Sequence, residues 1–564
     1  MNSKIILVFL GVLGSVMPSR TLLDQVRESS PYDLLISNAH ILDGAGSPWY
    51  EGSIAIKDDK IADIGRLGKV GAKRTIDARG LIVAPGFIDL HSHSDYALLV
   101  DGKAESKIRQ GVTTEVIGEH WSAGPVLGPA IPDVDRELAT FGLRRNWSTL
   151  GEYFTVLQKR GTAVNIASYV GAGQVRLDVM GNVDRAPTSV ELEQMESLVD
   201  QAMREGAIGL SAGLIYPPNS FAKTEELIEL AKVAAKYGGI YTSHIRDEGD
   251  HETESLSEAI EIGIKAGLPV HVLHLKVAGQ QNWGKMAEVV AQIQNARDHG
   301  LDITADQYPY IAGMTGLQMT LPPKYLEGTH QQVVARLKDA KAREEIRHLI
   351  ETGVQGWENH VQGAGGWHGV MVAAVQRPEN KQYEGQRMDE VAKRMGKEPV
   401  DALCDLLASE ETFPYAIYFA MSEPDVRIAM QQPWVGFGSD GVAVNPDMTF
   451  MGRPHPRFYG TFPRVLGLYV REQKVLSLSD AVRKMTSLPA QIIGLSDRGR
   501  LLPGMAADIA IFDPKTVNDM ATFDDPSRYP TGIPYVIVNG VVVIDQGKHS
   551  GALPGRVLYG RGKV

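Results

Sequence analysis

The sequence predicts an α/β protein: a parallel (β/α)8 TIM-like barrel with a small β-sandwich formed by both chain ends and an insertion in the barrel. Three observations predict this fold. Strand-like and helical segments alternate through the middle of the chain, strand-like segments recur at both ends, and a charged stretch breaks the alternation. Repeated strand–helix units require a parallel sheet with helices outside it, and such a sheet can close into a barrel.

The composition is that of an ordinary globular protein. The chain has 564 residues, of which 43% are hydrophobic and 22% are charged, so it can bury several cores. A formal net charge of −11 argues against a nucleic-acid partner. The single cysteine, Cys404, excludes an intramolecular disulfide and a cysteine-rich zinc site. Any metal must therefore be bound mainly by nitrogen and oxygen.

The N-terminus has the pattern of a targeting segment. Lys4 precedes an apolar run over residues 5–17, which is too short to span a bilayer and has the length of a signal-peptide core. We expect residues 1–20 to be a signal peptide and the chain to be exported to the periplasm or secreted. The alternative is an apolar extension on a cytoplasmic protein. No other run is long enough to predict a transmembrane span.

Strand-like segments at the two ends indicate the β-sandwich. Residues 33–43 and 52–65 have strand character, with a hairpin turn at Asp58-Asp59-Lys60, and similar segments return at 507–512, 535–539 and 541–544. We therefore expect residues 30–84 and 490–564 to form one β-sandwich domain, and residues 85–489 to form the catalytic barrel.

The middle of the chain supplies the strand–helix units. A helix over 190–204 begins with the capping-box spacing of Thr188 and Glu191, and Thr224 is the expected N-cap of the next helix. Gly267 ends a helix over 254–266. We expect strands at 209–212, 240–244, 270–274 and 303–306 to alternate with these helices, and one further helix at 285–298.

Residues 322–397 interrupt the alternation. They contain a charged helical stretch and a segment rich in glycine and tryptophan, so we expect an inserted subdomain, which could cover the barrel as a lid. We expect the barrel pattern to resume with strands at 416–421 and 435–440.

Polar residues suited to metal binding recur where the strands end. His91 and His93 lie two apart in a predicted strand, so their side chains project from the same face. Chemistry in such barrels occurs at the carboxyl ends of the strands. His271 lies three residues before His274, so in a strand their side chains face opposite ways, and we interpret His271 as structural. The other polar residues at predicted strand ends are Glu119, His120, His244, His274 and Asp440.

These residues resemble a known family. His91-Ser92-His93 after Pro85-Gly86-Phe87, with His244, His274 and Asp440, resembles the amidohydrolase superfamily pattern. Longer motifs resemble its D-aminoacylase (N-acyl-D-amino-acid deacylase) branch: Ser243-His244-Ile245-Arg246-Asp247-Glu248, His274-Leu275-Lys276, Tyr308-Pro309-Tyr310 and His455-Pro456-Arg457. The resemblance implies a metal-dependent barrel that uses one or two Zn²⁺ ions or another divalent metal. It assigns His91, His93 and Asp440 to one metal, and His244 and His274 to the other.

The ligand that bridges the metals is where the chain departs from this branch. Relatives usually carry a cysteine in a Gly-Asn-Cys-Gly loop, and here the loop reads Gly118-Glu119-His120-Trp121. A bridge needs two lone-pair sites at one end, which a carboxylate has and a neutral imidazole lacks. We therefore expect Glu119 to bridge, with His120 as the alternative.

The resemblance also implies catalytic and substrate-binding residues. Asp440 would take a proton from water and deliver it to the leaving amine. Lys276 shares a strand face with His274 and is the expected partner of a substrate carboxylate. The other expected substrate contacts are Tyr216, Tyr308, Arg246 and His120, although Arg246 could instead form an internal salt bridge.

The expected reaction is metal-dependent hydrolysis of a C–N amide bond, deacylating an N-acyl-D-amino acid to a carboxylate and a free D-amino acid. A cyclic amidase, a dipeptidase or a carbamate hydrolase on the same scaffold is the alternative, because fold alone does not set function. A non-catalytic exported binding protein is a third hypothesis, which the complete histidine set disfavours. The expected partner is a small amide that bears a carboxylate, and the oligomeric state is left open.

Overall fold

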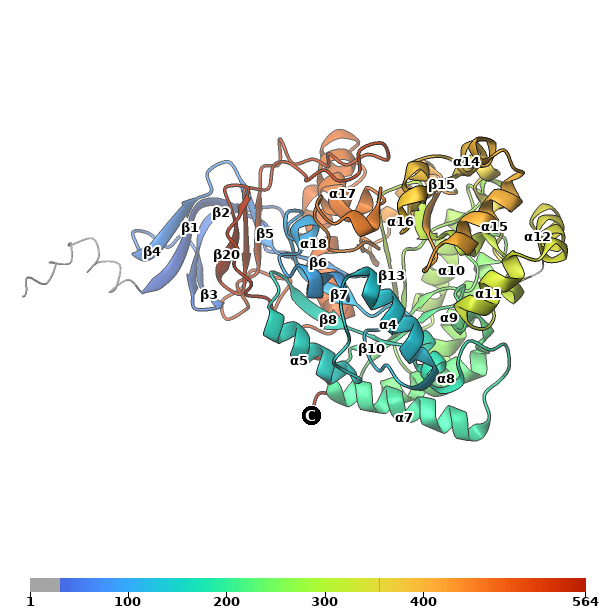
Figure 1. Cartoon of the computed structure of the whole chain (residues 1–564). Helices are drawn as coiled ribbons and strands as arrows, with labels where there is room; N and C mark the ends of the chain where they lie inside the picture. The colour runs from blue at the N-terminus through green and yellow to red at the C-terminus, as the bar shows by residue number, and fades with distance from the viewer. Residues whose placement is uncertain (1–30, 355) are drawn as a thin grey trace, which may run out of the picture.

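The computed structural model describes residues 31–354 and 356–564, so the expected signal peptide lies outside the described residues. Figure 1 shows the barrel at the centre, the sheet of the two chain ends on one side of it, and the inserted segment on the other. None of the helices in the described ranges has the length and apolar character needed to cross a membrane.

The predicted (β/α)8 barrel is confirmed. In the part of the chain that the structure describes, neighbouring barrel strands pair in parallel, and Tyr169 divides one of the eight into β8 and β9. The Leu90 N–H donates to the Phe437 carbonyl at 3.5 Å, which joins the first strand to the last. The strands are β6 (Phe87–Asp89), β7 (Val112–Ile117), β8 (Asn165–Ser168), β9 (Val170–Gly171), β10 (Gly209–Gly213), β11 (Ile240–His244), β12 (Val270–Val272), β13 (Ile303–Gln307) and β17 (Val435–Phe437).

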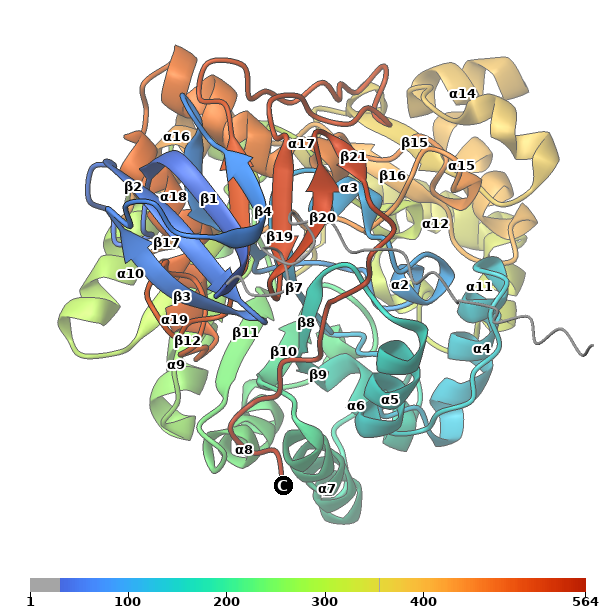
Figure 2. The ribbon, with the colours of Figure 1, turned by 90° about the vertical axis from the view of Figure 1, so that its left-hand side faces the viewer.

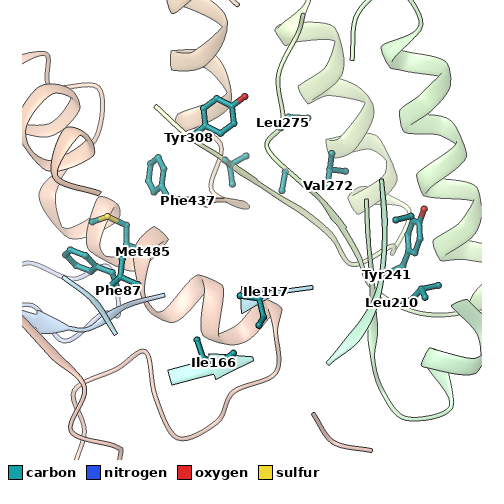
Figure 3. Close-up of a cluster of buried hydrophobic side chains, with 14 of the residues drawn as sticks. Phe87, Ile117, Ile166, Leu210, Tyr241, Val272, Leu275, Tyr308, Phe437 and Met485 are labelled. Atoms are coloured by element: carbon teal, nitrogen blue, oxygen red, sulfur yellow. The ribbon is translucent and has the colours of Figure 1, made fainter. Parts of the chain in front are cut away.

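Helices surround this barrel, and apolar side chains fill the space between. Figure 3 shows part of that core, with Phe87, Ile117, Val272 and Phe437 among its buried residues. The helices that follow successive strands include α2 (Ala97–Val100), α3 (Glu105–Ile108), α4 (Ile131–Thr140), α5 (Leu150–Arg160), α6 (Ala172–Met180), α7 (Ser189–Glu205), α8 (Thr224–Ala235), α9 (Glu252–Ala266), α10 (Met286–Asp298), α16 (Glu423–Met430), α17 (Arg457–Arg464), α18 (Leu478–Met485) and α19 (Ser487–Ile492).

Local sequence signals set several helix ends. Thr188 and Glu191 form the predicted capping box at the start of α7, and Gly267 ends α9 with a φ of 71°. The prediction for Thr224 is wrong, because Lys223 occupies the N-cap and Thr224 is the first residue of α8. The Thr224 hydroxyl donates instead to Glu258, a tertiary contact that local spacing does not reveal.

The two chain ends form one mixed sheet, as predicted. Its nine strands in the described ranges are β1 (Tyr32–Ile41), β2 (Tyr50–Lys57), β3 (Lys60–Gly65), β4 (Ala72–Asp77), β5 (Ile82–Pro85), β18 (Ile509–Phe512), β19 (Tyr535–Val538), β20 (Val541–Asp545) and β21 (Lys548–His549). Figure 2 shows these strands against the barrel. Ile36, Ile54 and Ile509 share one core, because the sheet curls and brings its two halves together as layers.

One glycine connects this sheet to the barrel. β5 ends at Pro85 and β6 begins at Phe87, so only Gly86 separates the two. A Cβ atom at residue 86 would lie 2.1 Å from Thr113 Oγ1, so a larger residue would clash. The short connection fixes where the chain enters the barrel, and His91 follows four residues after Phe87.

The insertion lies between β13 and β17. Its strands pair antiparallel in the order β14 (Gly313–Gly316), β16 (Tyr415–Tyr418), β15 (Val370–Ala374). The expected barrel strand at 416–421 is therefore wrong, since Ala416 belongs to β16 in this separate sheet. The departure from the barrel thus extends on both sides of 322–397. Its helices are α11 (His330–Leu337), α12 (Ala340–Thr352), α13 (His360–Gly363), α14 (Met388–Met395) and α15 (Pro399–Ser409).

Candidate functional site

Side chains from the ends of five barrel strands meet at one place. The strands β6, β7, β11, β12 and β17 lead into or end with these side chains. In the described ranges, three sets of ligand atoms each lie within 4.8 Å of one another: His91, His274 and Asp440; His91, His93 and Glu119; Glu119, His244 and His274. The structure thus brings together every residue that the sequence analysis proposed as a metal ligand.

Glu119 lies between the two histidine pairs. Its Oε2 is 3.3 Å from His91 Nε2 and 3.1 Å from His93 Nε2, and its Oε1 is 3.9 Å from His244 Nδ1. The preceding Gly118 has a φ of 83°, and a Cβ there would lie 2.5 Å from the Tyr169 carbonyl oxygen. This turn directs the carboxylate into the barrel, with one oxygen facing each side.

His120 lies outside the three sets. Its Nδ1 is 3.5 Å from Glu119 Oε2, and its ring stacks on Tyr216 with 4.5 Å between the ring centroids. His120 does not line the cavity described below, so the geometry gives no support to its expected contact with substrate. Its place favours a packing role beneath Tyr216.

Asp440 lies between the histidines and a buried arginine. Its Oδ1 is 3.0 Å from His93 Nε2, and its Oδ2 is 3.0 Å from Arg457 Nη2. Burial raises the pKa of Asp440, but the Arg457 guanidinium and His91 outweigh burial and hold it well below its usual value. Asp440 is therefore ionised at neutral pH.

Two of the candidate ligands have a left-handed backbone. His274 has a φ of 36° and Asp440 a φ of 47°, a conformation that costs a non-glycine residue about 1 kcal/mol or more. Hydrogen bonds hold both: the His274 N–H donates to Asp306 Oδ1 at 2.9 Å, and the Asp440 N–H donates to the His91 carbonyl at 2.8 Å. The fold thus maintains these two side chains in an unfavourable conformation that points them at the common centre.

Buried networks support the ligands from below. Lys107 Nζ donates to Asp89 Oδ2 at 2.8 Å, and the Ser439 N–H donates to Asp89 Oδ1 at 2.7 Å, which ties the end of β6 to the turn before Asp440. His271 contacts Asp306 Oδ2 at 2.9 Å and is fully buried, as expected of a structural residue.

Glu248 is a residue that the sequence analysis did not assign. Its Oε2 lies 3.3 Å from His244 Nε2, and its Oε1 lies 3.0 Å from His274 Nδ1 and 2.6 Å from Lys276 Nζ. Burial raises the pKa of Glu248, but His244 and Lys276 outweigh burial and lower it. One ionised carboxylate therefore orients both rings on the side of Glu119 Oε1. The available signal was its spacing, four residues after His244.

The ligands open into a cavity of about 140 Å³. His244, His274 and Asp440 line part of its wall, and residues of the insertion line another part. Of the expected substrate contacts, Tyr216, Tyr308 and Lys276 line the cavity. Lys276 also forms an ion pair with Glu248, through the 2.6 Å contact between Nζ and Oε1 given above.

Arg246 has a different place from the one expected. It pairs with Glu258 through Nε at 2.8 Å and donates to the carbonyls of Ser220 and Ala222, each at 2.9 Å. It does not line the cavity. We correct its expected role from substrate contact to the internal salt bridge, because its donors are used within the protein.

Arg457 is a second residue that the sequence analysis left without a role. It is 2% exposed, its guanidinium carbon lies 4.5 Å from the centre of the Tyr308 ring, and it pairs with Asp440. Its Nε and Nη1 have no hydrogen-bond partner among the described residues. Arg457 does not itself line the cavity, but it lies against Tyr308 and Asp440, which do. A buried cation with unused donors at this position is suited to an anionic group. The motif His455-Pro456-Arg457 was the available signal.

The chemistry of the ligand set fits a divalent metal. Both ring nitrogens of His91 and of His244, and Oε1 of Glu119, are buried without a hydrogen-bond partner in the described ranges. Leaving a buried polar group unpaired costs about 1–3 kcal/mol. A cation among these atoms would satisfy Glu119 Oε1 and one ring nitrogen of each histidine, and neutral imidazoles with carboxylates are the ligands that Zn²⁺ prefers when cysteine is absent.

Comparisons with known proteins agree with this site. Residues 74–544 match the model of the Amidohydrolase family. The chain is 36% identical over 531 residues to D-aminoacylase of Alcaligenes xylosoxydans xylosoxydans, and the match covers 94% of this chain and 98% of that protein.

Two solved structures have the same fold along nearly their whole length. N-acyl-D-glutamate deacylase from Bordetella bronchiseptica, complexed with zinc and a phosphonate inhibitor, superposes with a TM-score of 0.80 at 34% identity, covering 94% of this chain and 99% of that one. A D-aminoacylase studied for the role of its binuclear metal center gives a TM-score of 0.78 at 34% identity, covering 94% and 100%. The chain therefore belongs to the amidohydrolase family.

Proposed function

We propose that this protein is a zinc-dependent N-acyl-D-amino-acid deacylase, which hydrolyses its substrate to a carboxylate and a free D-amino acid. The observation that carries the proposal is the position of Glu119, whose two carboxylate oxygens face two histidine pairs at the end of a cavity. Relatives named for this reaction match nearly the full chain.

The proposed metal ligands divide into two groups that share Glu119. His91, His93 and Asp440 would hold one ion, and His244 and His274 the other. When bound, a zinc ion polarises an amide carbonyl and lowers the pKa of water toward neutrality. Glu248 orients the rings of the second group through the contacts given above.

Asp440 is the proposed general base and acid. Its Oδ1 faces the histidines, where it accepts a proton from the attacking water and then donates that proton to the leaving amine nitrogen. Arg457 holds Oδ2 and keeps the carboxylate ionised before the reaction. Oδ1 thus transfers the proton, while Oδ2 stays paired with Arg457.

The substrate carboxylate requires cationic or neutral donors near this base. Arg457 presents Nε and Nη1 without partners among the described residues, and Lys276 and Tyr308 line the adjoining cavity. Burial lowers the pKa of Lys276, but Glu248 outweighs burial and raises it, so Lys276 stays charged. We assign the carboxylate of the amino acid to this set of donors.

A substrate screen tests the proposal. Zinc-loaded protein is assayed with N-acetyl-D-amino acids, N-acetyl-L-amino acids, dipeptides and cyclic imides. We expect hydrolysis of the D series with release of acetate. Turnover confined to dipeptides or cyclic imides would contradict the proposal in favour of another amide hydrolase, and metal binding without turnover of any amide would favour a binding protein.

Export is a separate proposal that rests on the apolar run over residues 5–17. Fractionation of cells that express the full chain tests it. We expect the protein, shortened at its N-terminus, in the exported fraction, and full-length protein in the cytoplasm would contradict export.

A further inference from the structure

Part of the cavity wall, which we call the acidic end, carries several carboxyl groups. Asp247, Asp250 and Glu358 line it, in addition to Glu248 beside the histidines. Among the described residues that line the cavity, Lys276 is the single lysine or arginine, and it lies 2.6 Å from Glu248 Oε1. The outer carboxyl groups therefore have no matching cation within the cavity wall.

Glu358 comes from the insertion and contacts Glu248, which orients the ligand histidines, through one hydrogen bond. Its Oε2 accepts the Glu248 N–H at 3.1 Å, and its side chain is 14% exposed. Within the described ranges, no lysine or arginine forms an ion pair with it. Burial, with the nearby Glu248 and Asp247, raises the pKa of Glu358 well above its usual value. A cation placed here would relieve this crowding of carboxyl groups.

A neighbouring histidine is also incompletely satisfied. His360 lines the cavity, and its side chain is 9% exposed. Its Nδ1 lies 3.6 Å from Glu358 Oε1, too far for a good hydrogen bond, and has no hydrogen-bond partner among the described residues. The insertion thus presents buried polar atoms to the cavity that a bound polar group would complete.

Apolar and aromatic side chains also line the cavity. Tyr216, Met314, Trp357 and Tyr418 line the cavity. Methylene groups pack on such side chains, and aromatic rings attract cations. A cavity that combines such apolar side chains with carboxyl groups is suited to a long side chain with a cationic tip.

We propose that this end of the cavity binds the cationic side chain of the amino acid, so that N-acyl-D-lysine and N-acyl-D-arginine are preferred substrates and acidic ones are disfavoured. Glu358 is the specificity-determining residue, supplied by the insertion. The inference rests on the proposed deacylase function. It gives this chain the opposite charge preference from that in the name of the Bordetella bronchiseptica relative, which is an N-acyl-D-glutamate deacylase.

Two substrate pairs of matched shape test the preference. N-acetyl-D-lysine is compared with N-acetyl-D-norleucine, which lacks the ammonium group, and N-acetyl-D-glutamate with N-acetyl-D-glutamine. An opposite charge within about 4–6 Å favours an ionised group by about tenfold or more. We therefore expect kcat/KM for lysine to exceed that for norleucine by about tenfold, and glutamine to exceed glutamate by a similar factor.

A conservative variant locates the preference at Glu358. We expect Glu358→Gln to lower the lysine-to-norleucine ratio of kcat/KM at least about threefold, through a higher KM for lysine. Glu351→Gln, an exposed position on the neighbouring helix α12, is the matched control and should keep the wild-type ratio. Circular dichroism spectra check that both variants fold.

Binding to metal-free protein separates this inference from the reaction. Calorimetry with N-acetyl-D-lysine and N-acetyl-D-norleucine gives the ratio of Kd values without turnover. If no amide is hydrolysed but lysine binds about tenfold more tightly and Glu358→Gln removes the difference, the reaction is wrong and the subsite stands. If D-amino acids are released but norleucine equals lysine, or the variant leaves the ratio unchanged, the subsite is overturned.

Discussion

At the scale of single residues, Glu119 defines this centre. A carboxylate can give one oxygen to each of two cations, whereas a neutral imidazole has one lone pair and can serve only one. The contacts in the structure follow this difference, because Oε2 faces His91 and His93 while Oε1 faces His244. With Glu119 as the proposed bridge, the ligand set contains only nitrogen and oxygen, which are harder ligands than a thiolate.

The bridge assignment predicts metal content. Replacing Glu119 with glutamine removes the charge that two ions would share, so we expect zinc bound per chain to fall, measured by elemental analysis after dialysis. His120→Ala is the matched control at the neighbouring position and should keep the wild-type content. Full zinc in Glu119→Gln together with loss in His120→Ala would reverse the assignment.

Asp440 predicts a loss of rate without loss of fold. Asparagine keeps the shape of the side chain but cannot accept the proton, so we expect kcat to fall by about 10²–10⁴-fold. The histidines remain, so some zinc should still bind. Asp447→Asn, at an exposed position in the loop that follows β17, is the control. Near-normal kcat in Asp440→Asn would remove this residue from the reaction.

Glu248 predicts weaker metal binding. Carboxylates that hold ligating histidines contribute about 10–100-fold in affinity or activity. We expect Glu248→Gln to weaken Co²⁺ binding by about this factor in spectroscopic titrations, and to shift the visible bands of the bound ion. Glu252→Gln changes a buried glutamate four residues further along the chain, at the first residue of α9, and should leave both unchanged. Equal affinity in the two variants would contradict the role of Glu248.

At the scale of elements, the sequence predicts correctly those features that depend on residues close together in the chain. The strand–helix alternation and the capping box at Thr188 depend on neighbours in sequence, and the structure contains both. The segment at 416–421 failed because a short apolar run has the same pattern in a barrel and in an antiparallel sheet. The roles of Arg457 and of the ion pair of Arg246 depend on partners further away in the sequence, which spacing alone does not reveal. For Glu248, spacing indicates the contact with His244 but not the contact with His274.

Helix α6 contains a buried carboxyl that predicts a pH dependence. Asp178 Oδ1 accepts the Leu127 N–H at 2.8 Å, and its Oδ2 has no partner in the described ranges. Burial raises the pKa of Asp178 from 3.8 to about 8. Below pH 3.8 both the folded and unfolded chains hold this proton. As pH rises toward 8, the unfolded chain loses it while the folded chain keeps it, so the stabilisation is lost across that window.

The test compares Asp178→Asn with the wild type in denaturant unfolding at several pH values. Asparagine does not titrate, so we expect the free energy of unfolding of the variant to rise relative to the wild type by more than ~1 kcal/mol between pH 4 and pH 8. Asp184→Asn, at an exposed position just beyond α6, should show no such trend. If the difference in free energy of unfolding between Asp178→Asn and the wild type stays constant with pH, the pKa of Asp178 is not raised in the folded chain.

At the scale of the whole molecule, two features bring distant parts of the chain together around the barrel. The first is the sheet of the chain ends, in which β5 pairs with β18 and leads through Gly86 into β6. The second is the ligand set, which joins the ends of β6 and β7 to those of β11, β12 and β17. Residues at opposite ends of the sequence, such as His93 and Asp440, thus meet at the same centre.

This arrangement predicts that metal stabilises the whole fold. An ion that binds the folded chain but not the unfolded one adds about 2.7 kcal/mol when present at a hundred times its Kd. We expect zinc to raise the Tm of metal-free protein in calorimetry by several degrees, and Glu119→Gln to reduce that rise. Mg²⁺ prefers all-oxygen, octahedral sites and should have little effect. An unchanged Tm with zinc, although zinc binds, would mean that the unfolded chain binds zinc as tightly as the folded one, because binding to the folded chain alone must raise its stability.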